Sequence, residues 1–226
     1  MPKLLEVIVT SVEEAREAEL GGADRIELVR ALETGGLTPT PEVVEQVVNA
    51  VSIPVRVMLR ENASMSASDP REIGALQASA RQLAQLPIDG FVLGFVKNGS
   101  LDLETMGQVL ADVAGRRATL HRAFEYVGDS VAAIREAKTL PQIDRILTSG
   151  GDGSWQQRKA RLLEWRAAAE PEIRILIGVG LQTSVLTEMA NHSEDFEFHA
   201  GRAARFPHTT AGLVSREQVA KLKALL

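Results

Sequence analysis

The sequence predicts a single (β/α)8 barrel spanning residues 1–226, and three observations support this fold class. Short runs rich in aliphatic and β-branched residues alternate with amphipathic stretches of helical period along the whole chain. Eight such strand–helix pairs can be counted, the number that closes a parallel barrel. A weak repeat places an aspartate (Asp24, Asp89 and Asp144) just before three of the predicted strands. An open, doubly wound parallel sheet is the alternative architecture.

The predicted strands are short and separated by turn residues. In chain order they cover residues 4–10, 25–29, 54–60, 90–96, 117–124, 144–149, 173–180 and 197–201. The helices after them are expected at residues 12–20, 42–51, 70–86, 103–114, 130–140, 155–169, 184–191 and 216–226. Ser11 with Glu14 three residues later predicts a capping box. Thr40-Pro41 and Asp69-Pro70 place a proline in the first turn of their helices.

Composition narrows the classes of function. The net charge is −5 with basic and acidic residues intermixed, so no nucleic-acid or membrane surface is expected. The longest apolar runs, such as residues 90–96, are too short to span a bilayer. There is no secretory cleavage pattern and no cysteine, so disulfides, thiolate nucleophiles and thiolate metal sites are excluded. A cytoplasmic location fits these features.

Alternation within the strands predicts a charged barrel interior. If the apolar positions pack against the helices, every second residue points toward the barrel axis. The inward charged residues are then Glu6, Glu27, Arg56, Arg60, His121 and His199. Glu6 and Arg56 lie early in their strands, and the three aspartates precede theirs, so all five are read as structural. Glu27, Arg60, His121, Ser149 and His199 lie nearer the C-terminal ends, where barrel enzymes place their chemistry. A buried ion-pair network that fixes register is the alternative for this second group.

Glycines cluster after the last three strands. Gly150, Gly178, Gly180 and Gly201, with Arg202 beside them, are suited to bind an anion through exposed backbone N–H groups. Purely conformational turns are the alternative explanation for these glycines. The loop at residues 33–40 follows the second strand and is well placed to cover a ligand.

His121 is a candidate general acid or base because imidazole titrates near neutral pH, and Glu27 is a candidate to orient it. A structural hydrogen-bonding histidine is the alternative. His121 and His199 could together hold a metal if they converge with carboxylates, and such an oxygen and nitrogen site suits Zn(II) or Cu(II) better than Cu(I). His192 and His208 fall in polar segments and are expected to be solvated.

Several strings taken together resemble one family, the CutC proteins, named for a proposed role in copper homeostasis. The strings are GGADRIELVRALETGGLTPT, IPVRVMLREN, DGFVLGFVKNGSLD, TLHRAFEYVGD, IDRILTSGG and EFHAGRAAR. The resemblance extends from near residue 5 to near residue 205. It implies a (β/α)8 barrel, a cytoplasmic location, self-association to a homo-oligomer and an association with copper. The family's recurring polar residues correspond here to Glu27, Arg60, His121, Arg122, Ser149 and His199.

The chain departs from the family pattern at two places. Val29-Arg30 stands where family members often carry a cysteine linked to copper binding, so soft Cu(I) coordination is not implied for this chain. The glycine-rich loop after the third strand is replaced by RENASMSASD, which retains Arg60.

Three functional hypotheses therefore stand. The first is a cytosolic CutC-like protein associated with copper. The second is a barrel enzyme or binder of a small anionic molecule, with phosphorylated metabolites included in that class. In it, Arg60 and the Gly178–Gly180 turn hold the anion while His121, assisted by Glu27, moves a proton. The third is a non-catalytic oligomeric scaffold whose interior charges serve only stability.

Overall fold

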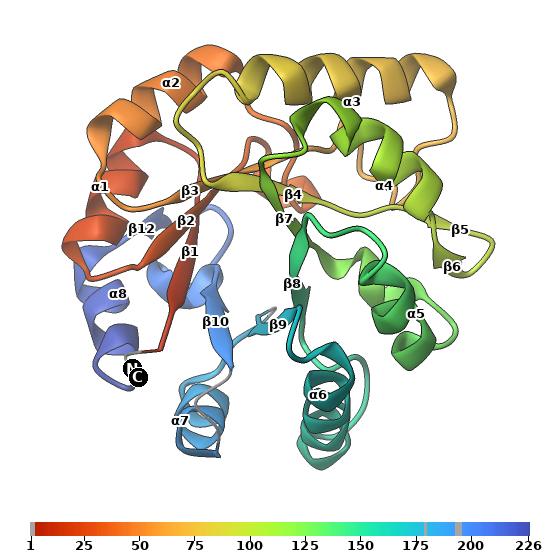
Figure 1. Cartoon of the computed structure of the whole chain (residues 1–226). Coiled ribbons are helices and arrows are strands. Elements are labelled where there is room, and N and C mark those ends of the chain that lie inside the picture. The colour runs from red at the N-terminus through yellow and green to blue at the C-terminus, as the bar shows by residue number, and fades with distance from the viewer. Residues whose placement is uncertain (1–2, 179, 193–195) are drawn as a thin grey trace.

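Parallel strands form a closed barrel surrounded by helices (Figure 1). The computed structural model describes residues 3–178, 180–192 and 196–226. The barrel strands are β1 (Leu5–Val9), β2 (Arg25–Leu28), β3 (Val55–Met58), β4 (Gly90–Leu93), β7 (Arg117–Leu120), β8 (Ile143–Thr148), β9 (Arg174–Ile177) and β10 (Glu197–Ala200). Strand β1 pairs in parallel with both β2 and β10, so the sheet closes on itself. The predicted barrel is confirmed, and the open doubly wound sheet is wrong.

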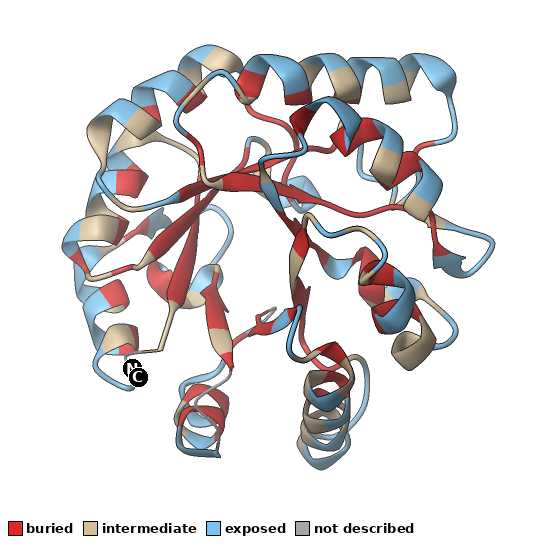
Figure 2. Cartoon of the chain, in the orientation of Figure 1, coloured by how far each residue is buried: buried red, intermediate tan, exposed pale blue. Residues whose placement is uncertain are grey.

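Each barrel strand leads to a helix on the outside. The helices are α1 (Val12–Leu20), α2 (Pro41–Ala50), α3 (Pro70–Leu83), α4 (Leu103–Leu110), α5 (Ser130–Ala137), α6 (Trp155–Ala169), α7 (Thr183–His192) and α8 (Arg216–Lys223). Figure 2 shows buried residues on the strands and on the inner faces of the helices, with exposed residues on the outer faces. Among the described residues, no helix combines the length and the hydrophobicity needed to cross a lipid bilayer.

The capping box predicted at Ser11 forms only in part. The Ser11 hydroxyl accepts a hydrogen bond from the Glu14 backbone N–H at 3.3 Å, as a helix N-cap should. The Glu14 carboxylate, however, accepts from the Thr10 backbone N–H at 2.8 Å and from the buried guanidinium of Arg205. The Glu14 carboxylate, which the local sequence pattern predicts to cap the helix, is thus bound by Arg205, which is distant in sequence.

Several predicted strands end earlier than expected: β4 at Leu93, β7 at Leu120 and β9 at Ile177 each stop at least three residues short. Two small hairpins lie outside the barrel. The hairpins pair β5 (Val96–Lys97) with β6 (Ser100–Leu101), and β11 (Arg205–Phe206) with β12 (Leu213–Val214). Strand β7 ends at Leu120, and a short 3-10 helix, η3 (Arg122–Tyr126), follows. The reason is local: the His121 ring accepts the Ala123 backbone N–H at 3.1 Å and so starts the helical turn.

The strand register agrees with the predicted alternation. The helix-facing Val55, Val57 and Leu59 belong to the main apolar core between strands and helices. Ile8, Val29, Met58 and Val92 form a separate apolar cluster, together with Leu32 packed against it. The first four residues of this second cluster share the inward parity of their strands and so fill the barrel above its charged base.

The base of the barrel is a network of buried ion pairs around Arg56. Its guanidinium donates to Asp89 at 2.7 Å, to both oxygens of Asp144 at 2.7 and 2.8 Å, and to the Thr119 hydroxyl at 2.7 Å. Asp24, at the same end, accepts from the Leu5 backbone N–H at 2.7 Å. The structural reading of Arg56 and of the repeated aspartates is therefore confirmed.

A second set of ion pairs connects strands near the point of barrel closure. Arg25 on β2 donates to Glu6 on β1 at 2.5 Å and lies 3.4 Å from Glu197 on β10. Arg145 on β8 donates to both oxygens of Glu197, at 2.5 and 2.8 Å. Because each partner keeps at least one opposite charge, the cost of burying these groups is offset.

Candidate functional site

A cavity of about 1040 Å³ opens at the C-terminal ends of the strands. Side chains from the loops after β2, β3, β7, β9 and β10 line it. Leu32, Glu33, Thr34 and Gly35 contribute to its wall, so the loop after β2 covers the mouth as predicted. The volume is in the range of small-molecule sites, and the location is where barrel enzymes place their chemistry.

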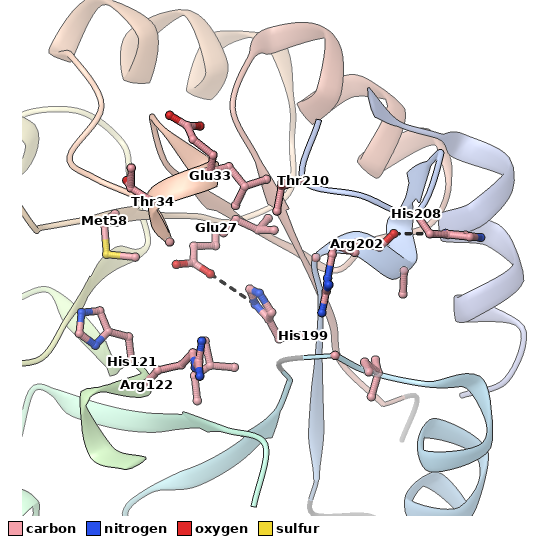
Figure 3. Close-up of a pocket in the computed structure, with 18 of the residues that line it drawn as sticks. Glu27, Glu33, Thr34, Met58, His121, Arg122, His199, Arg202, His208 and Thr210 are labelled. Carbon is pink, nitrogen blue, oxygen red and sulfur yellow. Dashed lines mark hydrogen bonds and ion pairs between the residues drawn. The ribbon is translucent and has the colours of Figure 1, made fainter. Parts of the chain in front are cut away.

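Glu27 and His199 form the centre of the site (Figure 3). His199 Nδ1 lies 2.9 Å from Glu6 Oε1 and 3.4 Å from Glu27 Oε2. All three residues are at most 6% exposed. Within the described part of the chain, Glu27 Oε2 is a buried atom without a hydrogen-bond partner. The imidazole is therefore hydrogen-bonded to Glu6, and Glu27 Oε2 faces it at ion-pair distance without a hydrogen bond of its own among the described residues.

The two carboxyl groups beside His199 have opposite pKa shifts. Burial raises the pKa of Glu27 to about 7, and the negative charge of Glu6 adds to this effect, while His199 opposes it. Burial would also raise the pKa of Glu6, but Arg25 and His199 hold it well below its usual range. Burial would lower the pKa of His199, yet its hydrogen bond to Glu6 and the charge of Glu27 raise it. Glu27 is thus the carboxyl that titrates near neutral pH.

His121 is a neutral hydrogen-bond donor rather than a partner of Glu27. Its Nδ1 accepts the Ala123 backbone N–H, and its buried Nε2 has no hydrogen-bond partner among the described residues. Burial, together with the positive charges of Arg60 and Arg122, lowers its pKa to about 3. The expected acid–base pair of His121 with Glu27 is wrong, because Glu27 lies against His199 and His121 stays uncharged at neutral pH.

Arg60 lines the cavity but uses its donors within the protein. Its guanidinium donates to the carbonyl groups of Gly35 and Gly36 at 3.3 and 3.4 Å, to that of Ala63 at 2.6 Å and to that of Ser64 at 3.3 Å. It therefore clamps the loops after β2 and β3 together, and supplies positive charge to the mouth. Direct binding of an anion by Arg60, as predicted, would compete with these four bonds.

The predicted glycine cradle is only partly at the cavity. Gly180, Gly201 and Arg202 line it, and residue 179 lies outside the described residues. Gly178 does not line it, since its N–H donates to the Thr148 carbonyl at 2.9 Å. Gly178 also has no room for a side chain, because an added Cβ would lie 2.6 Å from Leu147 and 3.0 Å from His199.

Ser149 and Gly150 are not among the residues that line the cavity. The Ser149 backbone N–H and hydroxyl both donate to one Glu125 oxygen, at 2.6 and 2.7 Å. The Gly150 N–H donates to the Thr148 hydroxyl at 3.1 Å. These groups are already paired, so the expectation that they contact a ligand is not supported.

The residues that could hold a metal are Glu6, Glu27 and His199. One ligand atom from each lies within 4.8 Å of the others. His121 is not part of this group, so the predicted convergence of His121 with His199 is wrong. One imidazole and two carboxylates, with the free Glu27 oxygen, fit Cu(II) or Zn(II) and not Cu(I), provided that His199 Nδ1 gives up its proton.

Residue patterns alone placed two groups elsewhere that lie at the mouth, although the family resemblance had already named Arg122. Arg122 and His208 both line the cavity. The resemblance names Arg122 without locating it, and its position in η3 places it at the mouth (Figure 3). His208 was expected to be solvated and is exposed, but its Nδ1 also lies 3.2 Å from the Arg202 carbonyl oxygen. The sequence did hold a signal for Arg122. If the strand continued through residue 122, alternation would place this charge on the apolar, helix-facing side of the strand, where a charge is unfavourable.

Fold and site together define a TIM-barrel protein with titratable groups at its C-terminal mouth. The CutC family model matches residues 3–204, and the chain belongs to the CutC family. It is 36% identical to the human copper homeostasis protein cutC homolog over 197 residues, which is 87% of this chain and 72% of the human protein. It is 33% identical over 205 residues to the family protein CutC of Caulobacter vibrioides, covering 90% of this chain and 83% of that protein. The resemblance inferred from the sequence strings is confirmed.

Solved structures support the fold. The putative copper homeostasis protein CutC from Streptococcus agalactiae superposes with a TM-score of 0.78 at 22% identity, covering 88% of this chain and 98% of that chain. Orotidine 5'-phosphate decarboxylase from Pyrococcus horikoshii superposes with a TM-score of 0.65 at 14% identity, covering 98% of each chain. At these identities the likeness concerns the barrel alone.

Proposed function

We propose that this protein binds a small anionic molecule in the mouth cavity and moves a proton on it with the Glu27–His199 pair. The observation that carries the proposal is the buried Glu27 Oε2, which lies 3.4 Å from His199 Nδ1 but has no hydrogen-bond partner in the described part of the chain, on a carboxyl group with a pKa raised to about 7. A general acid or base works best when its pKa lies near the working pH. Strongly perturbed groups in a cleft are typical of functional sites.

The charge around the cavity supports an anionic ligand. Arg60, Arg122 and Arg202 line it, and Arg60 is only 4% exposed. Arg60 has no carboxylate among the hydrogen-bond partners found in the described residues, so its positive charge acts on the cavity. Arg122 and Arg202 are the groups that can contact the ligand directly, while the charge of Arg60 makes the electrostatic potential in the cavity more positive.

A thermal-shift screen with phosphorylated and carboxylated metabolites tests this proposal. At least one compound should raise the melting temperature of the wild-type protein, and Arg202→Gln should abolish that shift. Arg216→Gln is the matched control, because Arg216 pairs with Glu17 at 3.9 Å and does not line the cavity. If no anion stabilises the wild type, or if both variants respond alike, the proposal fails.

Binding of copper as Cu(II) is the second candidate. The cluster of Glu6, Glu27 and His199 favours it, and so does the naming of the human and mouse relatives as copper homeostasis proteins. The carboxylates and the imidazole would hold the ion, which would act there as a Lewis acid or as cargo. Isothermal titration with Cu(II) should show one site that Glu27→Gln and His199→Gln each weaken at least tenfold. Equal binding by Glu33→Gln is the expected control result, and equal binding by all variants would exclude this site.

The scaffold hypothesis and the cellular properties remain proposals. A scaffold predicts that Glu27→Gln changes stability and leaves every ligand response of the wild type unchanged. The expected homo-oligomer can be checked by size-exclusion chromatography with light scattering, and the expected cytoplasmic location by fractionation of cells that express the protein.

A further inference from the structure

Two buried side-chain atoms in the same cavity lack hydrogen-bond partners among the described residues, and they have opposite polarity. Glu27 Oε2 is an acceptor, and His121 Nε2 is on a ring whose other nitrogen is already used. Glu27 is 1% exposed and His121 is 4% exposed, and both line the cavity. Figure 3 shows Glu27 and His121 among the residues that line it. A buried polar atom without a partner is costly, so a ligand that satisfies both atoms would bind favourably.

The hydrogen-bond pattern defines the state of His121. Because Nδ1 accepts the Ala123 N–H, it carries no proton, and the single ring proton is on Nε2. Arg60 and Arg122 place positive charge beside the ring and oppose a second proton. The ring is held against Gly94, where an added Cβ would lie 2.8 Å from Nδ1. His121 is thus a fixed, neutral N–H donor.

From this geometry we infer that the ligand is a small aldehyde or ketone bearing an anionic group, and that the protein enolises it. His121 Nε2–H donates a hydrogen bond to the carbonyl oxygen, and Glu27 Oε2 removes a proton from the neighbouring carbon. The inference rests on the proposed function, in that it uses the same cavity and the same base. The anionic group is repelled by Glu27 and attracted to Arg122 and Arg202, which fixes the direction in which the ligand lies.

The enolisation needs no oxidant, reductant or other co-reactant. The C–H bond breaks and its proton passes to Glu27 Oε2, while its electron pair forms the carbon–carbon double bond of the enolate. The carbonyl π pair moves onto oxygen, where the His121 N–H stabilises the developing charge without transferring its own proton. Return of the proton, or of a deuteron that has replaced it, from Glu27 to the same carbon restores the carbonyl compound and regenerates the site.

Among the described residues, neither cysteine nor lysine offers a nucleophile at the cavity, which favours proton transfer over covalent catalysis. Cysteine is absent from the sequence. Lys221 lines the outer part of the cavity, but its ammonium group pairs with Glu217 at 2.7 Å and its side chain is 61% exposed. Such a solvated lysine lacks the desolvation that activates an amine as a nucleophile.

Hydrogen exchange in D2O tests the inference, with dihydroxyacetone phosphate and pyruvate as probes. Proton NMR should show the wild-type protein replacing hydrogen next to the carbonyl of at least one probe faster than buffer. Glu27→Gln should lower the rate at least 100-fold. His121→Phe should lower it about tenfold or more, with part of the rate regained in His121→Gln, which again offers an N–H donor. Arg216→Gln should match the wild type.

A second measurement does not depend on turnover. Nitrogen-15 NMR of the histidine rings should show the His121 proton on Nε2 from pH 5 to pH 8, with a shift when either probe binds. A probe that stabilises the protein in the thermal-shift assay but exchanges no hydrogen overturns the enolisation and leaves the proposed function intact. If neither probe exchanges, or if the proton is found on Nδ1, the inference is wrong.

Discussion

Glu27 shows how the barrel interior sets the chemistry of one residue. The unfolded chain has an ordinary glutamate with a pKa of 4.5, whereas burial raises the pKa to about 7 in the folded protein. Between these two pH values the folded state holds a proton that the unfolded state has released. Stability from this group is therefore full below pH 4.5 and is lost as the pH rises through about 7.

Glu27→Gln should remove this pH-dependent loss. Relative to the wild type, we expect the free energy of unfolding of the variant to rise between pH 5 and pH 8, by on the order of 3 kcal/mol at most. The substitution also removes the Glu27 charge that helps to raise the pKa of His199. A histidine with a raised pKa makes the protein less stable as the pH increases, so a smaller rise in this pKa changes the pH profile of the variant in the same direction. Urea unfolding at the two pH values measures the effect. Parallel pH profiles for the two proteins would contradict it.

The orientation of the site residues could be predicted, but not their pairing. Strand alternation was enough to turn Glu27 and His199 inward. Which inward groups meet depends on barrel closure, and Glu6 and His199 are 193 residues apart in sequence. For the same reason the Glu27–His121 pair was wrong: both residues point inward, but closure brings β10 to β1 and so places His199 beside Glu27.

At the scale of elements, Gly90 marks a point where two neighbouring strands approach each other closely. This residue opens β4 opposite Arg117 of β7, and an added Cβ would lie 2.1 Å from the Arg117 carbonyl oxygen. The contact is with backbone, so it cannot be relieved by rotating a side chain. Only glycine fits at this point of the ladder.

Gly90→Ala should therefore cost about 3 kcal/mol or more in the free energy of unfolding, since the β4–β7 pairing must shift. Gly74→Ala is the matched control: Gly74 lies inside α3, and nothing lies within 4 Å of its added Cβ. Alanine there should stabilise the protein by up to about 1 kcal/mol. Chemical denaturation measures both. A mild effect of Gly90→Ala would show that the strands have room to separate.

The elements themselves were largely predictable because their signals are local. Periodicity located the barrel strands and their helices, and residues 155–169 match α6 at both ends. The ends of β4 and β7 were not predictable from periodicity. The apolar pattern continues to Phe95 and Phe124, but these residues are buried in the loops and η3 that follow the strands. Burial alone does not distinguish a strand from a packed loop.

At the scale of the whole molecule, the ion pairs at the base join strands that are far apart in sequence. Arg56 on β3 connects Asp89 before β4, Thr119 on β7 and Asp144 on β8. A charge at this depth is stable only while its partners remain. The network therefore forms in full only when the barrel is closed, because its partners come from separate strands.

Arg56→Met should destabilise the protein by about 3–5 kcal/mol, because it leaves buried carboxylates with fewer opposite charges. Arg71→Met on α3 is the control, since its side chain is 94% exposed and pairs with Asp69 only at 3.7 Å. Its effect should be below about 1 kcal/mol. The test is the free energy of unfolding in urea at neutral pH. Equal effects of the two substitutions would show that the network adds no stability.

The filled base also has a kinetic consequence. Glu6, Arg25 and Arg56 occupy the interior below the cavity, each at most 2% exposed, so the residues that the structure describes leave no passage along the barrel axis. A molecule that enters at the mouth must leave by the same opening. Entry and release of any ligand of the cavity should therefore depend on the loops after β2 and β3 that Arg60 joins.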